Sequence, residues 1–145
     1  MILGVLLFMQ VQGQPVKQYS FKHYSSTDGL ASYEVMSTIQ DETGYIWIGT
    51  NNGLQRFDGS RFITFRKERN STTSIPHNVV SQVFIDKKGN LWIVTGDGKI
   101  GIFDTKRFIY RDVPVNDLPE MVKRGDRKLI TDEAGHIFLL IFSQA

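Results

Sequence analysis

Short runs of β-branched and aromatic residues alternate with turn residues along most of this chain. Before residue 66 the apolar runs lie at residues 35–39, 45–49, 54–57 and 61–65. Runs of this length and composition predict β-strands, and the Asp, Asn, Gly and Ser residues between them predict hairpin turns. The Asn-Asn-Gly at 51–53 tolerates the positive φ that a tight hairpin requires. Because no long stretch has helical periodicity, the sequence predicts an all-β protein.

The same pattern occurs again further along the chain. Residues 41–53 read DETGYIWIGTNNG, and residues 86–98 read DKKGNLWIVTGDG. The alignment extends beyond both segments, with one extra residue near Lys99. A weaker third copy begins at Leu129, and its aligned residues are Asp132, Gly135 and Phe138, in the positions of Asp86, Gly89 and Trp92. Self-similarity at a period of about 45 residues is typical of a repeat architecture.

Four antiparallel strands in a unit of about 45 residues describe one blade of a β-propeller. The density of turns excludes a helical solenoid, and a β-helix coil would be shorter and would lack hairpins. We therefore predict a partial β-propeller of four-stranded antiparallel blades, about two and a half blades of a longer ring. We expect Trp47 and Trp92 to pack between neighbouring blades. The turn Asp and Gly residues should fix the hairpins through side-chain to backbone hydrogen bonds.

The number of units predicts that this sequence is a truncated piece of a longer protein, since a propeller ring needs at least four blades. Residues 19–24 are similar to the fourth-strand sequence, and we expect them to complete the last blade of a full ring. The apolar run at 2–9, followed by Val-Gln-Gly at 11–13, predicts a secretory signal peptide that is too short to span a bilayer. A buried N-terminal strand is the alternative. The predicted segments are a signal peptide at 1–13, a ring-closing strand and linker at 14–34, a first repeat at 35–78, a second repeat at 79–124 and the start of a truncated third repeat at 125–145.

The composition argues against nucleic acid as a partner and against any chemistry that needs cysteine. A formal net charge of +2 with scattered basic residues does not favour nucleic acid as a partner. The sequence has no cysteine, which excludes disulfides, thiolate catalysis and cysteine zinc sites.

No set of residues predicts catalysis, a cofactor or a metal. The Asp41-x-x-Gly44-x-x-Trp47 motif is similar to the Asp-box of sialidase-type propellers, but that motif places Gly two residues after Asp instead of three. It is therefore interpreted as a structural hairpin. The acidic side chains lack the alternating spacing of a calcium loop, and the histidines are dispersed. These residues are Asp41, Glu42, Asp126, Asp132 and Glu133, with His23, His77 and His136.

The loop at 67–74 is longer and more polar than its counterpart after Tyr24, and blade-connecting loops are where propellers display binding residues. Its basic and amide side chains could hydrogen-bond a sugar or a uronate, although a solvated charge run is the favoured interpretation. They are Arg66, Lys67, Arg69 and Asn70. The ligand-binding residues therefore stay unknown at this point.

Residues 39–58, IQDETGYIWIGTNNGLQRFD, resemble the propeller repeat of bacterial two-component regulators. That repeat is most familiar from the hybrid two-component sensors of gut Bacteroidetes, and residues 21–30 are similar to the start of their mature sensor domain. The second unit differs by Val94 and the extra Lys99. The third has Phe138 in place of Trp, followed by two leucines.

This resemblance implies a periplasmic sensor module made of tandem propellers. In such proteins an immunoglobulin-like domain, an inner-membrane helix, a histidine kinase and a response regulator follow. It further implies a homodimer that binds an oligosaccharide and regulates polysaccharide utilisation genes, without a cofactor. The chain itself is expected to be non-enzymatic and to reach the membrane only through segments downstream. A propeller lyase or glycosidase, and a protein-interaction propeller, are the alternatives.

Overall fold

A computed structural model of the chain describes residues 18–116 and 125–142, so the predicted signal peptide at 1–13 lies outside the described residues. The first unit contains β1 (Val35–Gln40), β2 (Ile46–Thr50), β3 (Gly53–Phe57) and β4 (Phe62–Phe65). The second contains β5 (Val80–Ile85), β6 (Leu91–Thr95), β7 (Ile100–Asp104) and β8 (Ile109–Asp112). A hairpin of β9 (Asp126–Thr131) and β10 (Ile137–Phe142) follows, and a short 3-10 helix, η1 (Ser26–Asp28), precedes β1.

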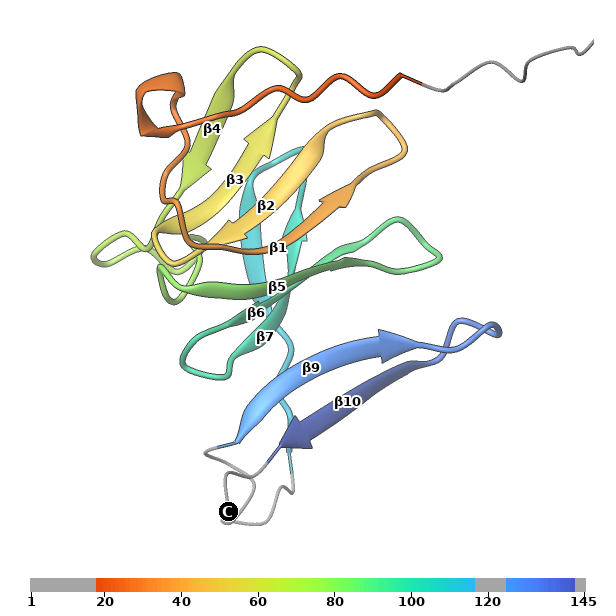
Figure 1. Cartoon of the computed structure of the whole chain (residues 1–145). Helices are drawn as coiled ribbons and strands as arrows, with labels where there is room; N and C mark the ends of the chain where they lie inside the picture. Colours follow the sequence, from red (N-terminus) through yellow and green to blue (C-terminus); the bar gives the residue numbers. More distant parts are fainter. Residues whose placement is uncertain (1–17, 117–124, 143–145) are drawn as a thin grey trace, which may run out of the picture.

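The strands form three antiparallel sheets, each in the order of the sequence (Figure 1). Two sheets have four strands, in the orders β1-β2-β3-β4 and β5-β6-β7-β8, and the third pairs β9 with β10. Strand β5 contacts both β1 and β9, so the first strands of successive units lie next to one another. This confirms the predicted partial propeller of four-stranded blades.

The β1–β2 turn and its counterparts repeat the same hydrogen bonds in all three units. The carboxylate of Asp41 accepts the backbone N–H groups of Thr43 at 2.9 Å and Tyr45 at 3.0 Å. Gly44 adopts a φ of 91°, which the absence of a Cβ allows. Asp86 and Asp132 accept the corresponding N–H groups of Asn90 at 2.9 Å and His136 at 2.8 Å. The predicted role of the turn Asp and Gly is confirmed.

The β2–β3 turn is less symmetric than its Asn-Asn-Gly sequence predicts. Among residues 51–53 only Gly53 has a positive φ, 123°. Instead of entering the left-handed region, Asn52 donates its backbone N–H to Thr50 Oγ1 at 3.0 Å, and its side-chain amide donates to the Ala31 carbonyl oxygen at 3.0 Å. The turn therefore relies on one glycine and on side-chain bonds.

The two tryptophans pack between successive units, as predicted. Trp47 is fully buried and its ring lies 5.8 Å, centroid to centroid, from that of Phe103 in the second unit. Trp92 packs on the cluster that contains Leu129, with Ile137 of the third unit beside it. Burial of large apolar side chains in these interfaces supplies the main stabilising term.

Side-chain to backbone hydrogen bonds join the first strands of neighbouring units. Ser37 Oγ accepts the backbone N–H of Val83 at 3.1 Å and donates to the Val83 carbonyl oxygen at 3.3 Å. One unit further along, Gln82 Oε1 accepts the N–H of Leu129 at 2.7 Å, and Gln82 Nε2 donates to its carbonyl oxygen at 2.8 Å. The repeat in sequence thus produces a repeat of the interface.

The segment that precedes β1 lies against the first blade, on the side away from the second (Figure 1). The Tyr24 ring packs edge-on at 4.9 Å from Phe57, and the buried Gln55 amide bonds the Gly29 carbonyl oxygen at 2.9 Å. Residues 19–24 form no strand in this structure. Their role in closing a ring stays a prediction.

Candidate functional site

Two adjoining clefts open where the first strands of the units follow one another. One has a volume of about 430 Å³ and is lined by Ser81, residues 95–98 and residues 125–127. The other has about 400 Å³ and is lined by residues 36–37, 81–82, 126–128 and Phe142. Because Ser81, Asp126 and Arg127 border both, we treat the two as one site, the inner-strand cleft.

Strand irregularities place side chains at this cleft. The β1–β2 pairing passes from Val35 opposite Thr50 to Ser37 opposite Gly49, which leaves Met36 as an inserted residue. The β5–β6 pairing skips Ser81 in the same way. A bulge of this kind re-aims a side chain at the rim of a sheet. Arg127 is the aligned residue of the third unit, although its pairing with Ile141 is regular.

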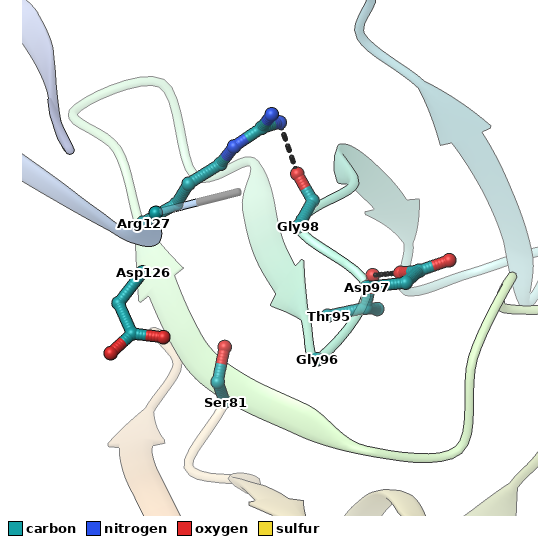
Figure 2. Close-up of a pocket in the computed structure, with 8 residues that line it drawn as sticks. Ser81, Thr95, Gly96, Asp97, Gly98, Asp126 and Arg127 are labelled. Carbon is teal, nitrogen blue, oxygen red and sulfur yellow. Dashed lines mark hydrogen bonds between the residues drawn. The ribbon is translucent and has the colours of Figure 1, made fainter. Parts of the chain in front are cut away.

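The cleft carries a carboxylate held by its own turn. Asp97 Oδ1 accepts the Thr95 hydroxyl at 2.6 Å (Figure 2). Partial burial acts to raise the pKa of Asp97, but the hydrogen bonds from Thr95 and from the Lys99 backbone, with the nearby charge of His77, lower that pKa overall. Asp97 is therefore ionised at neutral pH.

The guanidinium of Arg127, on β9, contacts this turn. Arg127 Nη1 donates to the carbonyl oxygen of Gly98, which ties β9 to the β6–β7 turn (Figure 2). Asp126 is exposed on the same strand, beside Ser81 of β5 in the same view. The site thus combines anionic and cationic side chains with backbone groups, a set suited to hydrogen-bonding a polar ligand.

The hydroxyl of Ser81 is not placed for nucleophilic catalysis. It donates to the backbone carbonyl oxygen of Val94 at 3.1 Å, whereas an activated serine needs a side-chain base at that position. Among residues 18–116 and 125–142, no group of three or more His, Asp or Glu side chains is arranged to hold a metal ion.

The structure places the polar loop at 67–74 away from the inner-strand cleft. Its basic residues are exposed, and Arg66 Nε donates to the Asn52 carbonyl oxygen at 3.1 Å. The backbone N–H of Lys67 donates to Asn78 Oδ1 at 2.8 Å. The loop borders a separate groove of about 410 Å³, together with Lys99 and Asp112 of the second unit.

The acidic and histidine residues considered in the sequence do not form one site. Asp41 and Asp132 lie in equivalent turns of different units, and Asp126 alone of these residues borders the cleft. His77 Nδ1 accepts the Val79 N–H at 3.1 Å, while His136 Nδ1 lies 2.8 Å from Asp132 Oδ2.

Sequence reasoning missed Met36 and Ser81 because a bulge has no periodic signal, and it missed Arg127 because contacts between units leave no pattern in a single strand. Aligning the three units would have shown that this position changes from apolar to hydroxyl to cationic. In units whose turn Asp and Gly residues repeat, this change of side chain is the signal that could have indicated a functional position.

Comparison with known proteins agrees with this architecture. The sequence matches the profile of the two component regulator propeller family at residues 29–52 and 74–97. Over 57 residues it is 39% identical to Histidine kinase P4 of Formosa agariphila, a match that covers 39% of this chain and 4% of that protein.

Two solved structures have a similar fold. The extracellular domain of the hybrid two component system BT3049 from B. thetaiotaomicron superposes with a TM-score of 0.69 at 24% identity, covering 81% of this chain and 17% of that one. The corresponding domain of BT4673 gives 0.60 at 25% identity, covering 74% and 15%. The chain thus spans a small part of each relative. The two matched segments are thus similar to the two-component regulator propeller repeat, and each contains the first two strands of a four-stranded blade.

Proposed function

We propose that this chain is part of the extracellular ligand-sensing domain of a hybrid two-component sensor, and that its full-length protein contains a histidine kinase. The observation that carries the proposal is that both segments matching the regulator repeat lie in four-stranded blades, where each forms the first two strands. Similarity to a histidine kinase, and to extracellular domains of hybrid systems, supports it.

The proposed location is the periplasm. Support comes from the relatives, whose matching domains are extracellular, and from the apolar segment at 2–9 in the sequence. Within the described part of the chain no helix is long and apolar enough to cross a bilayer. The signal peptide and the inner-membrane anchor of the full-length protein belong to the same proposal.

The proposed ligand is an oligosaccharide that the domain binds without altering it, as a signal for polysaccharide utilisation genes. Sugars are recognised through many hydrogen bonds, and the inner-strand cleft offers carboxylate, guanidinium, hydroxyl and backbone groups. The Ser81 hydroxyl is occupied by a backbone carbonyl, which favours binding over covalent chemistry. A homodimer of the full-length sensor is part of the proposal.

A binding screen tests this function. The purified chain would be titrated with a panel of neutral and acidic oligosaccharides by NMR, and each mixture would be analysed for products by mass spectrometry. We expect one class to shift the resonances of Ser81 and Asp126 without product formation. Ser81→Trp should block binding by filling the cleft, whereas Thr72→Trp, at the loop groove, should not. Turnover of any oligosaccharide, or binding by none, would contradict the proposal.

A further inference from the structure

The inner-strand cleft is bordered by equivalent residues of all three units, yet their chemistry is not repeated. The position occupied by Met36 in the first unit is Ser81 in the second and Arg127 in the third. The neighbouring turns and the adjacency of the first strands do repeat, although Met36 and Ser81 are inserted residues and Arg127 pairs regularly.

The third unit contributes both cations that border the cleft. Arg127 and Lys128 both border it from β9, and the Lys128 side chain is exposed. The bond from Arg127 to the Gly98 carbonyl oxygen holds the guanidinium at the cleft wall. A cation held in a fixed position loses less side-chain entropy when it binds an anion.

The single carboxylate common to both parts of the cleft is Asp126. A carboxylate accepts the hydroxyl groups of a sugar, whereas the two adjacent cations attract an anionic group. Asp97 borders only the larger part, where its Oδ1 accepts the Thr95 hydroxyl. A ligand that fits this set carries hydroxyl donors and an acidic group on one molecule.

We infer that the inner-strand cleft binds an acidic oligosaccharide, one bearing carboxylate or sulfate groups. The acidic group is placed beside Arg127 and Lys128, and sugar hydroxyls donate to Asp126. This inference rests on the proposed sensing function and specifies its ligand class. The residues at the Met36, Ser81 and Arg127 positions then set specificity, because each unit contributes a different group to the same opening.

The test compares matched probes on the 145-residue chain by calorimetric titration. The probes are tri-galacturonate, its fully methyl-esterified form and a galactose-6-sulfate disaccharide. We expect an acidic probe to bind at least about tenfold more tightly than the ester, because esterification removes the charge from a charge-assisted hydrogen bond. The carboxylate and sulfate probes distinguish the two sources of negative charge. Raising the salt concentration should weaken acidic binding only.

Three variants locate the contact. Arg127→Gln and Lys128→Gln should each weaken binding of the acidic probe about tenfold, whereas Arg69→Gln, at an exposed cation of the polar loop, should not change it. If Arg127→Gln lowers the melting temperature, the result for Lys128→Gln decides the question, because a substitution at this exposed side chain should not destabilise the fold.

Failure of this inference differs from failure of the sensing function. Equal affinity for tri-galacturonate and its ester, with NMR shifts at Ser81, would overturn the acidic class and leave sugar sensing intact. An unchanged affinity in Lys128→Gln and Arg127→Gln would overturn the assignment to these residues. Binding of neither acidic probe would overturn the inference, while the wider oligosaccharide panel decides the sensing function.

Discussion

The Asp41 carboxylate makes two kinds of hydrogen bond, one to the backbone of its own turn and one to the side chain of Trp47. Its Oδ1 accepts backbone N–H groups, and its Oδ2 accepts the Trp47 indole N–H at 2.7 Å. Asp41→Ala would leave the N–H of a buried indole without its acceptor, so we expect a loss of about 1–3 kcal/mol in unfolding free energy, measured by urea titration. Glu42→Ala, at an exposed carboxylate of the same turn, is the control and should change little. Equal effects of the two variants would contradict this role.

The same turns predict how stability depends on pH. Burial acts to raise the pKa of Asp41 and of Asp86. Hydrogen bonds from a tryptophan indole, from backbone N–H groups and from one further side chain, the Thr43 hydroxyl or the Asn90 amide, outweigh burial and lower both pKa values. A carboxyl group with a folded pKa below its unfolded value stabilises the fold above the unfolded pKa, near 3.8, and loses this contribution as the pH falls further. Stability should therefore decline below about pH 4. In Asp41→Asn that decline should be smaller, as measured by urea unfolding at pH 7, 5 and 3.5. An unchanged pH profile would show that Asp41 does not contribute.

The sequence predicted the function of these turn residues but not how the third turn is completed. Asp-x-x-Gly-x-x-Trp has a fixed local geometry, which is why Asp41 and Asp86 lie where expected. In the third unit the Phe138 side chain has no N–H to donate, and His136 Nδ1 lies beside the Asp132 carboxylate instead. Spacing alone does not identify that substitution, because it depends on which side chain reaches the carboxylate in space.

At the scale of elements, Gln82 connects the second blade to β9. Its amide makes two hydrogen bonds with the Leu129 backbone, at 2.7 Å and 2.8 Å. Gln82→Ala removes both, so we expect faster amide hydrogen exchange in β9, with β6 and β7 little affected. Gln18→Ala, the same substitution at an exposed residue before the first strand, should leave exchange unchanged. Unaltered exchange in Gln82→Ala would show that apolar packing alone holds β9.

The strand boundaries of the first unit were predictable to within about one residue, whereas contacts between units were not. Turn chemistry marks the ends of β2 and β3 locally. The inserted residues Met36 and Ser81 depend on how two strands align, and the bond from Ser37 to Val83 joins residues far apart in the chain. Long-range pairings of this kind leave no pattern in a single strand, so the inner-strand cleft could not be located from sequence.

At the scale of the whole molecule, the β9–β10 hairpin has one apolar face toward the second blade and another exposed to solvent. On the outer face Phe138, Leu140 and Phe142 are 47%, 37% and 54% exposed. Within the described residues β10 pairs with β9 alone, so one backbone edge of this apolar strand has no ladder partner. Exposed apolar edge strands promote pairing between chains. We expect the 145-residue chain to associate with itself as its concentration rises.

Light scattering coupled to size-exclusion chromatography measures this association. Two charges on the exposed face, in Phe138→Lys/Leu140→Lys, should shift the chain toward monomer, because lysines on an edge strand disfavour pairing. Both side chains face away from the second blade, so circular dichroism should still show folded sheets. Val115→Lys, at a partly exposed apolar residue outside the strands, should leave association unchanged. A wild-type chain that stays monomeric and melts cooperatively would mean that the first two blades and the hairpin are stable without further partners.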